Sequence, residues 1–122
     1  MTERVLGIGG VFFRSERPDE LSRWYAEHLG VDLDQDFAGK TFVAGDGDQT
    51  VWALFPADTA YFGPGGNDLM VNYRVRDLDA ILGQLRAAGI QVDDRVEDTK
   101  FGRFGWATDP EGNRFELWQR PG

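Results

Sequence analysis

One carboxylate in this sequence lies within an apolar stretch. Residues 115–118 (FELW) read as a short strand, with a Pro and Gly turn before them and Pro121 and Gly122 after them. Glu116 in this strand can be the structural partner of an arginine, a metal ligand, or the counter-charge of a cationic ligand. Apolar neighbours that exclude water would raise its pKa and suit it to proton transfer. Glu116 is therefore the candidate catalytic residue.

The side chains that share a face with Glu116 predict a binding cleft. Alternate residues of a strand face the same side, so Arg114 and Trp118 lie on the side of Glu116. The residues that we expect to bind a substrate there are Phe12, Phe55, Asn72, Arg74, Trp106 and Trp118. Aromatic walls with a few polar groups are typical of a small-molecule site. The alternative is structural, because strand aromatics often form plain core and Arg74 can pair with Glu116.

Composition narrows the class of protein. The chain has 122 residues, enough for one domain with its own core. Its net charge of -8 argues against nucleic-acid binding, which depends on Lys and Arg, and agrees with a cationic ligand. The absence of cysteine suits a reducing cytoplasm, and the sequence shows neither a signal peptide nor a membrane span. We expect a soluble cytoplasmic protein.

The order of expected elements repeats once along the chain. The first half predicts a strand at 5–14, a helix at 18–29, and strands at 31–33, 40–44 and 50–55. The second half predicts a strand at 69–75, a helix after Asp77, and strands at 90–92, 103–107 and 114–119. HLGVDL is echoed by AAGIQV, and GDGDQTVWALF by DPEGNRFELW. Each half therefore reads as a βαβββ module.

These modules predict an α+β fold in which a curved mixed sheet surrounds a cleft. Module one spans about 5–60, a linker rich in Gly and Pro spans about 61–67, and module two spans about 68–120. One helix cannot cover both faces of a module's sheet, so the modules must pack together or pair with another chain. The glycines of GIGG (7–10) do not precede a helix, which favours a bulge or backbone crowding over a dinucleotide loop.

The arrangement resembles the vicinal oxygen chelate superfamily, which includes glyoxalase I, extradiol dioxygenases and bleomycin-resistance proteins. The motifs that carry the resemblance are DPEGNRFELW and FFRSERPDELSRWYAEHLGV. The resemblance implies a divalent metal held by His or Glu on the first and last strand of each module. Glu116 matches one such position, whereas the other three fall at about Gly10, Ala53 and Met70. Those side chains cannot hold a hard cation, so we expect no metal cofactor.

Two functions follow from the resemblance. The first is a metal-independent small-molecule binding protein like the bleomycin-resistance branch, with a cationic or aromatic ligand. The alternative is a metal-dependent lyase or dioxygenase of the glyoxalase I type, acting on a small oxygenated substrate with Glu116 as ligand or base. A purely structural role in dimerisation is a third reading. The resemblance also implies a homodimer, and we assign no role to the single histidine, His28.

Overall fold

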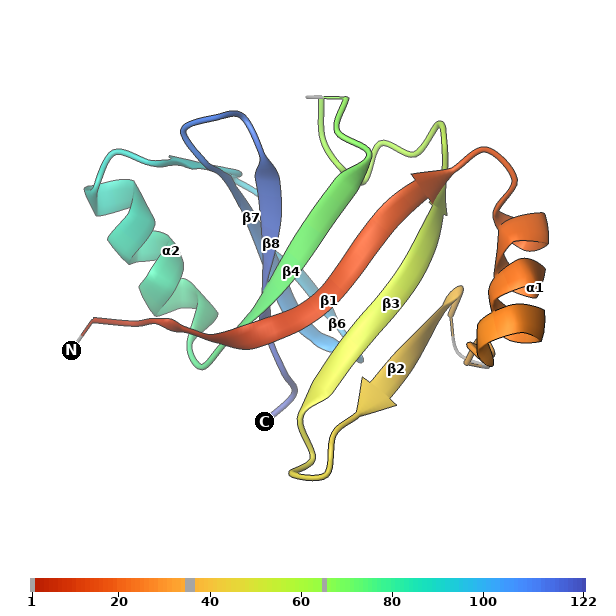
Figure 1. The fold of residues 1–122 in the computed structure, drawn as a ribbon. Helices are drawn as coiled ribbons and strands as arrows, with labels where there is room; N and C mark the ends of the chain where they lie inside the picture. Colours follow the sequence, from red (N-terminus) through yellow and green to blue (C-terminus); the bar gives the residue numbers. More distant parts are fainter. Residues whose placement is uncertain (1, 35–36, 65) are drawn as a thin grey trace.

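The computed structural model describes residues 2–34, 37–64 and 66–122. Figure 1 shows a strongly curved sheet with the two helices outside it, at opposite ends. The strands are β1 (Val5–Ser15), β2 (Gly39–Val43), β3 (Gln49–Pro56), β4 (Leu69–Val75), β5 (Gln91–Val92), β6 (Glu97–Thr99), β7 (Gly102–Thr108) and β8 (Arg114–Gln119). The helices are α1 (Pro18–Leu29) and α2 (Leu78–Ala87).

The sheet joins the two halves through their first strands. Its order is β2-β3-β1-β4-β8-β7-β5, with β6 also paired to β7. Strands β1 and β4 run antiparallel, while each runs parallel to the last strand of its own half, β3 or β8. This is the mixed sheet of an α+β fold, as the repeated element order predicts. The antiparallel centre brings one face of both halves around a shared concavity.

Two details differ from the predicted βαβββ order. Residues 31–33 form no strand, because Asp34 joins the chain directly to β2. The backbone N–H of Asp34 donates to the carbonyl of Gly39, and its carboxylate accepts from the backbone N–H of Thr41. In the second half, β6 was not predicted. Strands β5 and β6 both pair with β7, so they form one edge strand interrupted between them.

The helices cover the convex face unequally. On α2, Asp77 caps the first turn through its bond to the Ala80 N–H, and one apolar stripe packs against β8. The cluster under α2 contains Val75, Leu78, Ile81, Leu82 and Leu117. In contrast, α1 has no buried residue and rests on the sheet mainly through aromatic contacts of Tyr25. Neither helix is long and apolar enough to cross a membrane, among the residues described.

The GIGG segment lies at an irregularity of the sheet. The register between β1 and β4 shifts between Val5 and Gly7 and again between Ile8 and Gly10. The predicted bulge is therefore confirmed. The shift places Gly9 between Ile8, which pairs with Tyr73, and Gly10, which pairs with Asn72, and the side chains of β4 lean over its backbone.

Candidate functional site

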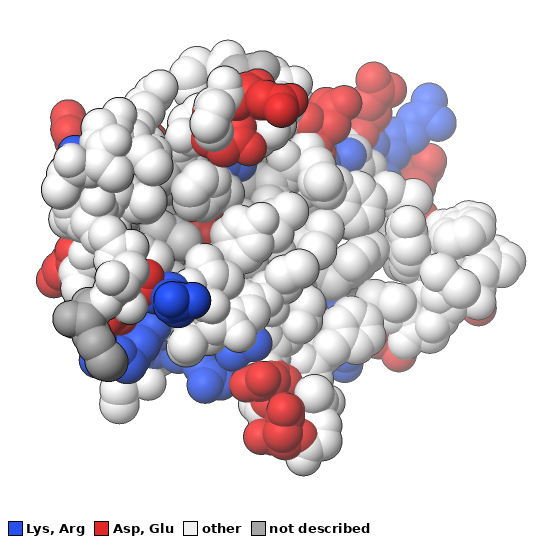
Figure 2. Space-filling model, turned by 60° about the vertical axis from the view of Figure 1, so that its left-hand side comes forward, with Lys and Arg blue, Asp and Glu red and all other residues white. Residues whose placement is uncertain are grey.

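A cleft of about 740 Å³ lies on the concave face and takes its walls from both halves of the chain. Its deepest residues are Gly9, Asn72 and Glu116, and its aromatic walls are Phe12, Phe55, Tyr61, Phe104 and Trp118. More exposed residues at its mouth include Phe37, Lys100, Phe101 and Pro121. Figure 2 shows a broad uncharged area across the middle of one face of the molecule, with charged side chains at its margins.

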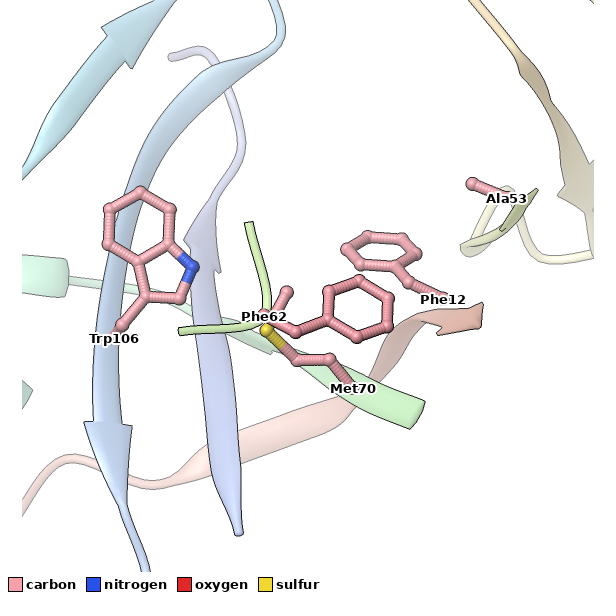
Figure 3. Close-up of a cluster of buried hydrophobic side chains, with 5 residues drawn as sticks. All are labelled: Phe12, Ala53, Phe62, Met70 and Trp106. Atoms are coloured by element: carbon pink, nitrogen blue, oxygen red, sulfur yellow. The ribbon is translucent and has the colours of Figure 1, made fainter. Parts of the chain in front are cut away.

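The hydrophobic cluster of the concave face supports one side of this cleft. It contains Phe12, Ala53, Phe62, Met70 and Trp106. In Figure 3 the ring of Phe62 lies between Trp106 and Phe12, so a residue from the segment between β3 and β4 fills the concavity. This packing leaves the remaining concave space near β2, β3 and the end of β8.

Glu116 is the central polar group of the site and is fully buried. The amide nitrogen Nδ2 of Asn72 donates to its Oε1 at 2.6 Å. The indole Nε1 of Trp106 donates to its Oε2 at 2.9 Å, and the hydroxyl of Tyr61 donates to the same oxygen. Three donors from three different elements thus hold one carboxylate in a single orientation.

Burial is the largest influence on the pKa values of Glu116 and Tyr61. It raises the pKa of Glu116, although the hydrogen bonds from Tyr61, Asn72 and Trp106 act in the opposite direction. The pKa of Tyr61 is also raised, first by burial and then by the negative charge of Glu116. Tyr61 therefore keeps its proton and remains a donor. A carboxylate with a raised pKa in a cleft can exchange a proton or balance a ligand's charge.

The two arginines considered as partners of Glu116 bind elsewhere. Nη2 of Arg114 lies 2.7 Å from Asp93, and its Nη1 donates to the backbone carbonyl of Tyr61. Nη1 of Arg74 lies 3.2 Å from Asp48. The pairing of Arg74 with Glu116, which was the structural alternative, therefore does not form in this structure. Arg114 still acts on the site, because its positive charge opposes the rise in the pKa of Glu116.

The structure brings together five of the seven predicted site residues. Glu116, Asn72, Phe12, Phe55 and Trp118 all line the cleft. Trp106 lies behind the lining, fully buried, and acts through its bond to Glu116. Arg74 lies beside the cleft, packed over the glycines of β1.

Tyr61 is the residue that sequence reasoning missed. It falls in the expected linker at 61–67, where Gly and Pro suggested a spacer. Its ring stacks on Phe55, with centroids 5.2 Å apart, and its hydroxyl reaches Glu116. The signal that could have revealed it is the adjacent pair Tyr61 and Phe62, because two aromatic residues are unusual in a solvated linker.

The donors at the strand positions do not fit a divalent metal. Gly10, Ala53 and Met70 offer no oxygen or imidazole side chain, and Asn72 contributes only an amide beside Glu116. Within the ranges described above, no three His, Cys, Asp or Glu side chains converge in a way that could hold a metal ion. One carboxylate and one amide oxygen fall short of the ligands that Zn²⁺ or Mn²⁺ requires.

A second hollow lies on the outer surface beside α1. It includes Ser15, Arg17, Trp24 and Tyr25, and is more open than the cleft. Its charged residues are exposed, and Arg17 and Glu20 pair with each other there. Its buried polar residue, Ser15, already accepts a hydrogen bond from the backbone N–H of Arg17, so the hollow has, among its described residues, no buried charged group like Glu116 of the cleft.

Comparisons with known proteins agree on the family and the fold. A family model described as "Glyoxalase-like domain" matches residues 10–118. No curated protein matches the chain. The methylmalonyl-CoA epimerase of Streptomyces coelicolor, solved with 2-nitronate-propionyl-CoA, superposes with a TM-score of 0.71 at 17% identity, over 98% of this chain and 100% of that one.

Two further solved structures are similar. The methylmalonyl-CoA epimerase of Mycobacterium tuberculosis gives a TM-score of 0.68 at 21% identity, over 100% of this chain and 93% of that chain. The Mn(II)-bound glyoxalase of Novosphingobium aromaticivorans gives 0.67 at 23% identity, over 96% of this chain but 40% of that one. At these identities the likeness shows the fold alone.

Proposed function

This chain belongs to the family of glyoxalase-like domains, within the vicinal oxygen chelate superfamily, and we propose that it is a small-molecule binding protein that does not use the superfamily's usual metal site. The ligand is aromatic, with a cationic group that approaches Glu116. The protein acts as a homodimer, in keeping with the apolar residues that α1 leaves exposed, such as Trp24 and Leu29.

One observation carries this proposal: the fully buried carboxylate of Glu116 lies in the wall of a mainly apolar and aromatic cleft. The other carboxylate that lines the cleft, Asp34, is already paired with Lys40 and Thr41. The walls include Phe55, Tyr61, Phe104 and Trp118, whose ring faces suit a flat or cationic ligand. The rings of Phe104 and Trp118 are parallel, with centroids 6.0 Å apart. The Nε1 of Trp118 donates to the Phe101 carbonyl at 2.8 Å, which fixes this wall. A preformed aromatic cleft binds a rigid ligand with little ordering cost.

The ligand set argues for binding without a metal. In the superfamily's metal sites several side chains from the first and last strands would converge, whereas here Phe12 and Ala53 occupy the first half's share of that surface. Glu116 instead directs its carboxylate to three protein donors. A carboxylate engaged in this way balances a cation by charge rather than by coordination.

The test is a thermal-shift screen with aromatic cations, followed by calorimetric titration of the best compound and elemental analysis of the tag-free protein. Phe104→Leu trims the cleft wall, and we expect it to weaken binding about five-fold or more by removing ring contact. Phe115→Leu is the matched control, because Phe115 packs in the α2 cluster on the opposite face. Equal losses from both variants, or a screen without a single ligand, would overturn the proposal.

A further inference from the structure

We propose that the deep end of the cleft is a subsite for a nitrogen that carries hydrogens, a primary or secondary ammonium or an amidinium, read jointly by Asn72 and Glu116. This inference rests on the proposed function and specifies its ligand. It separates such nitrogens from quaternary ammonium groups, which carry the same charge and no N–H.

The first observation is an unpaired acceptor. Asn72 is 1% exposed, and its Oδ1 has no hydrogen-bond partner among the residues that the structure describes. Nδ2 of Asn72 donates to Glu116, the arrangement that suits an ionised carboxylate because that group only accepts, and Oδ1 therefore points away from it. A buried acceptor without a donor is unfavourable, so this oxygen favours any donor that enters the cleft.

The second observation is the remaining capacity of the carboxylate. Oε2 of Glu116 accepts from both Tyr61 and Trp106, whereas Oε1 accepts from Asn72 alone within the described part of the chain. An oxygen of a carboxylate can accept two hydrogen bonds. Oε1 of Glu116 and Oδ1 of Asn72 thus provide two neighbouring acceptors from adjacent strands, where Asn72 and Glu116 are register partners.

Gly9 makes the position of Oδ1 available. A Cβ on Gly9 would stand too close to the Asn72 Oδ1 for any real contact, and 2.8 Å from the ring of Trp118. The glycine therefore lets the amide oxygen and the indole ring meet over the bare backbone of β1. The space over Gly9 is thus filled by Asn72, Trp118 and the Cγ of Arg74. A ligand group that enters the cleft beside them meets the acceptors of Asn72 and Glu116 and the ring of Trp118.

Size and charge select the ligand group. Both acceptor residues are almost completely buried, so only a small group such as one nitrogen can reach them while the ligand body stays among the aromatic walls. The paired acceptors, one of them charged, favour a cationic donor over a neutral one. A trimethylated nitrogen would cover the acceptors and satisfy neither, which penalises it despite its charge.

The experiment compares three probes with one aromatic body: naphthylmethylammonium, its N,N,N-trimethyl derivative and naphthylmethanol, titrated into the wild-type protein at pH 7. We expect the ammonium to bind about 10-fold or more tightly than either of the others. Equal affinities for the ammonium and its trimethyl derivative would overturn the subsite and leave the proposed function standing. If none of the three binds at millimolar concentration, both proposals fail.

Substitutions of glycine test whether the preference for the ammonium arises beside Asn72. Gly9→Ala places a methyl group against the amide of Asn72, and we expect it to reduce the preference for the ammonium to about three-fold or less while naphthylmethanol binding changes little. Gly83→Ala in α2 is the matched control, because a Cβ there meets open space. If Gly9→Ala does not fold, Asn72→Ala tests the same oxygen. A preference that survives in the folded variant contradicts the assignment.

Discussion

Replacing Glu116 by glutamine separates its role in folding from its role in binding. Glutamine has nearly the same shape and keeps one acceptor, which can receive the bonds from Trp106 and Tyr61. Its NH₂ then faces Asn72, whose amide can rotate so that Oδ1 accepts. All three hydrogen bonds survive in neutral form, and a desolvated charge is removed.

The expected changes in stability follow from the number of hydrogen bonds that each variant keeps. We expect Glu116→Gln to change the free energy of unfolding by between zero and about +2 kcal/mol, because relief of desolvation offsets the weaker neutral bonds. Glu116→Ala leaves the buried donors of Asn72 and Trp106 without an acceptor and opens a cavity, at a cost of about 3 to 5 kcal/mol. At roughly 4 °C per kcal/mol, the alanine variant melts about 12 to 20 °C lower.

The pH dependence gives an independent check. The pKa of Glu116 is raised in the folded protein, so the folded state holds this proton more strongly than the unfolded chain does. The stability that this proton contributes is fully present below the ordinary glutamate pKa of about 4.5 and is lost as the pH rises through the folded value. The stability of wild type relative to Glu116→Gln should fall across that window.

Urea denaturation of wild type and both variants between pH 4 and pH 8 measures these quantities. Calorimetric titration of the same proteins with an aromatic ammonium should show that glutamine weakens binding by about 1.5 to 3 kcal/mol, or about 10- to 150-fold. The reasoning is refuted if Glu116→Gln melts as low as Glu116→Ala, or if it binds the ammonium as well as wild type does. The first outcome would mean that the fold requires the charge of Glu116, and the second would mean that the ligand does not use it.

Three further predictions concern the same site and the assembly. Tyr61→Phe keeps the stack on Phe55 but removes a donor to Glu116. Urea denaturation at pH 7 should therefore show a free energy of unfolding that is lower by about 1 to 2 kcal/mol, with a larger pH dependence than that of wild type. An unchanged denaturation curve would mean that the hydroxyl bond adds nothing to stability. Thermal shifts with Ni²⁺, Zn²⁺, Mn²⁺ and Fe²⁺ should be small, about 1 °C or less, because Asp34 and Glu116, which line the cleft, belong to no cluster of three metal-binding side chains among the residues described. Stoichiometric metal that is lost in Glu116→Gln would contradict this. Light scattering at micromolar concentration should give about twice the chain mass of 13.7 kDa, because α1 leaves Trp24 half exposed and available for a dimer contact. A measured mass near that of one chain counts against the dimer.

The element pattern was predictable because its signals are local. Pro18 at the first turn and Gly30 in the left-handed conformation at the end set the bounds of α1, which match the sequence prediction. The period of two along β8 placed Glu116 and Trp118 on one face and Leu117 on the other, as observed. The strand predicted at 31–33 does not form, because a strand needs a neighbouring strand to pair with and the turn made by Asp34 leaves these residues without one.

The sequence by itself therefore determined the two repeated halves and the isolated carboxylate, because each of these depends on residue type and short spacing. Only the tertiary structure decided what surrounds Glu116. Tyr61, Asn72 and Trp106 are 55, 44 and 10 residues away from it in the chain, and they converge because β8 pairs with both β4 and β7 and the segment after β3 folds back over the concave face. The arginines went elsewhere because Asp48 and Asp93 lie at the surface, where an ion pair costs less desolvation than one beside the buried carboxylate.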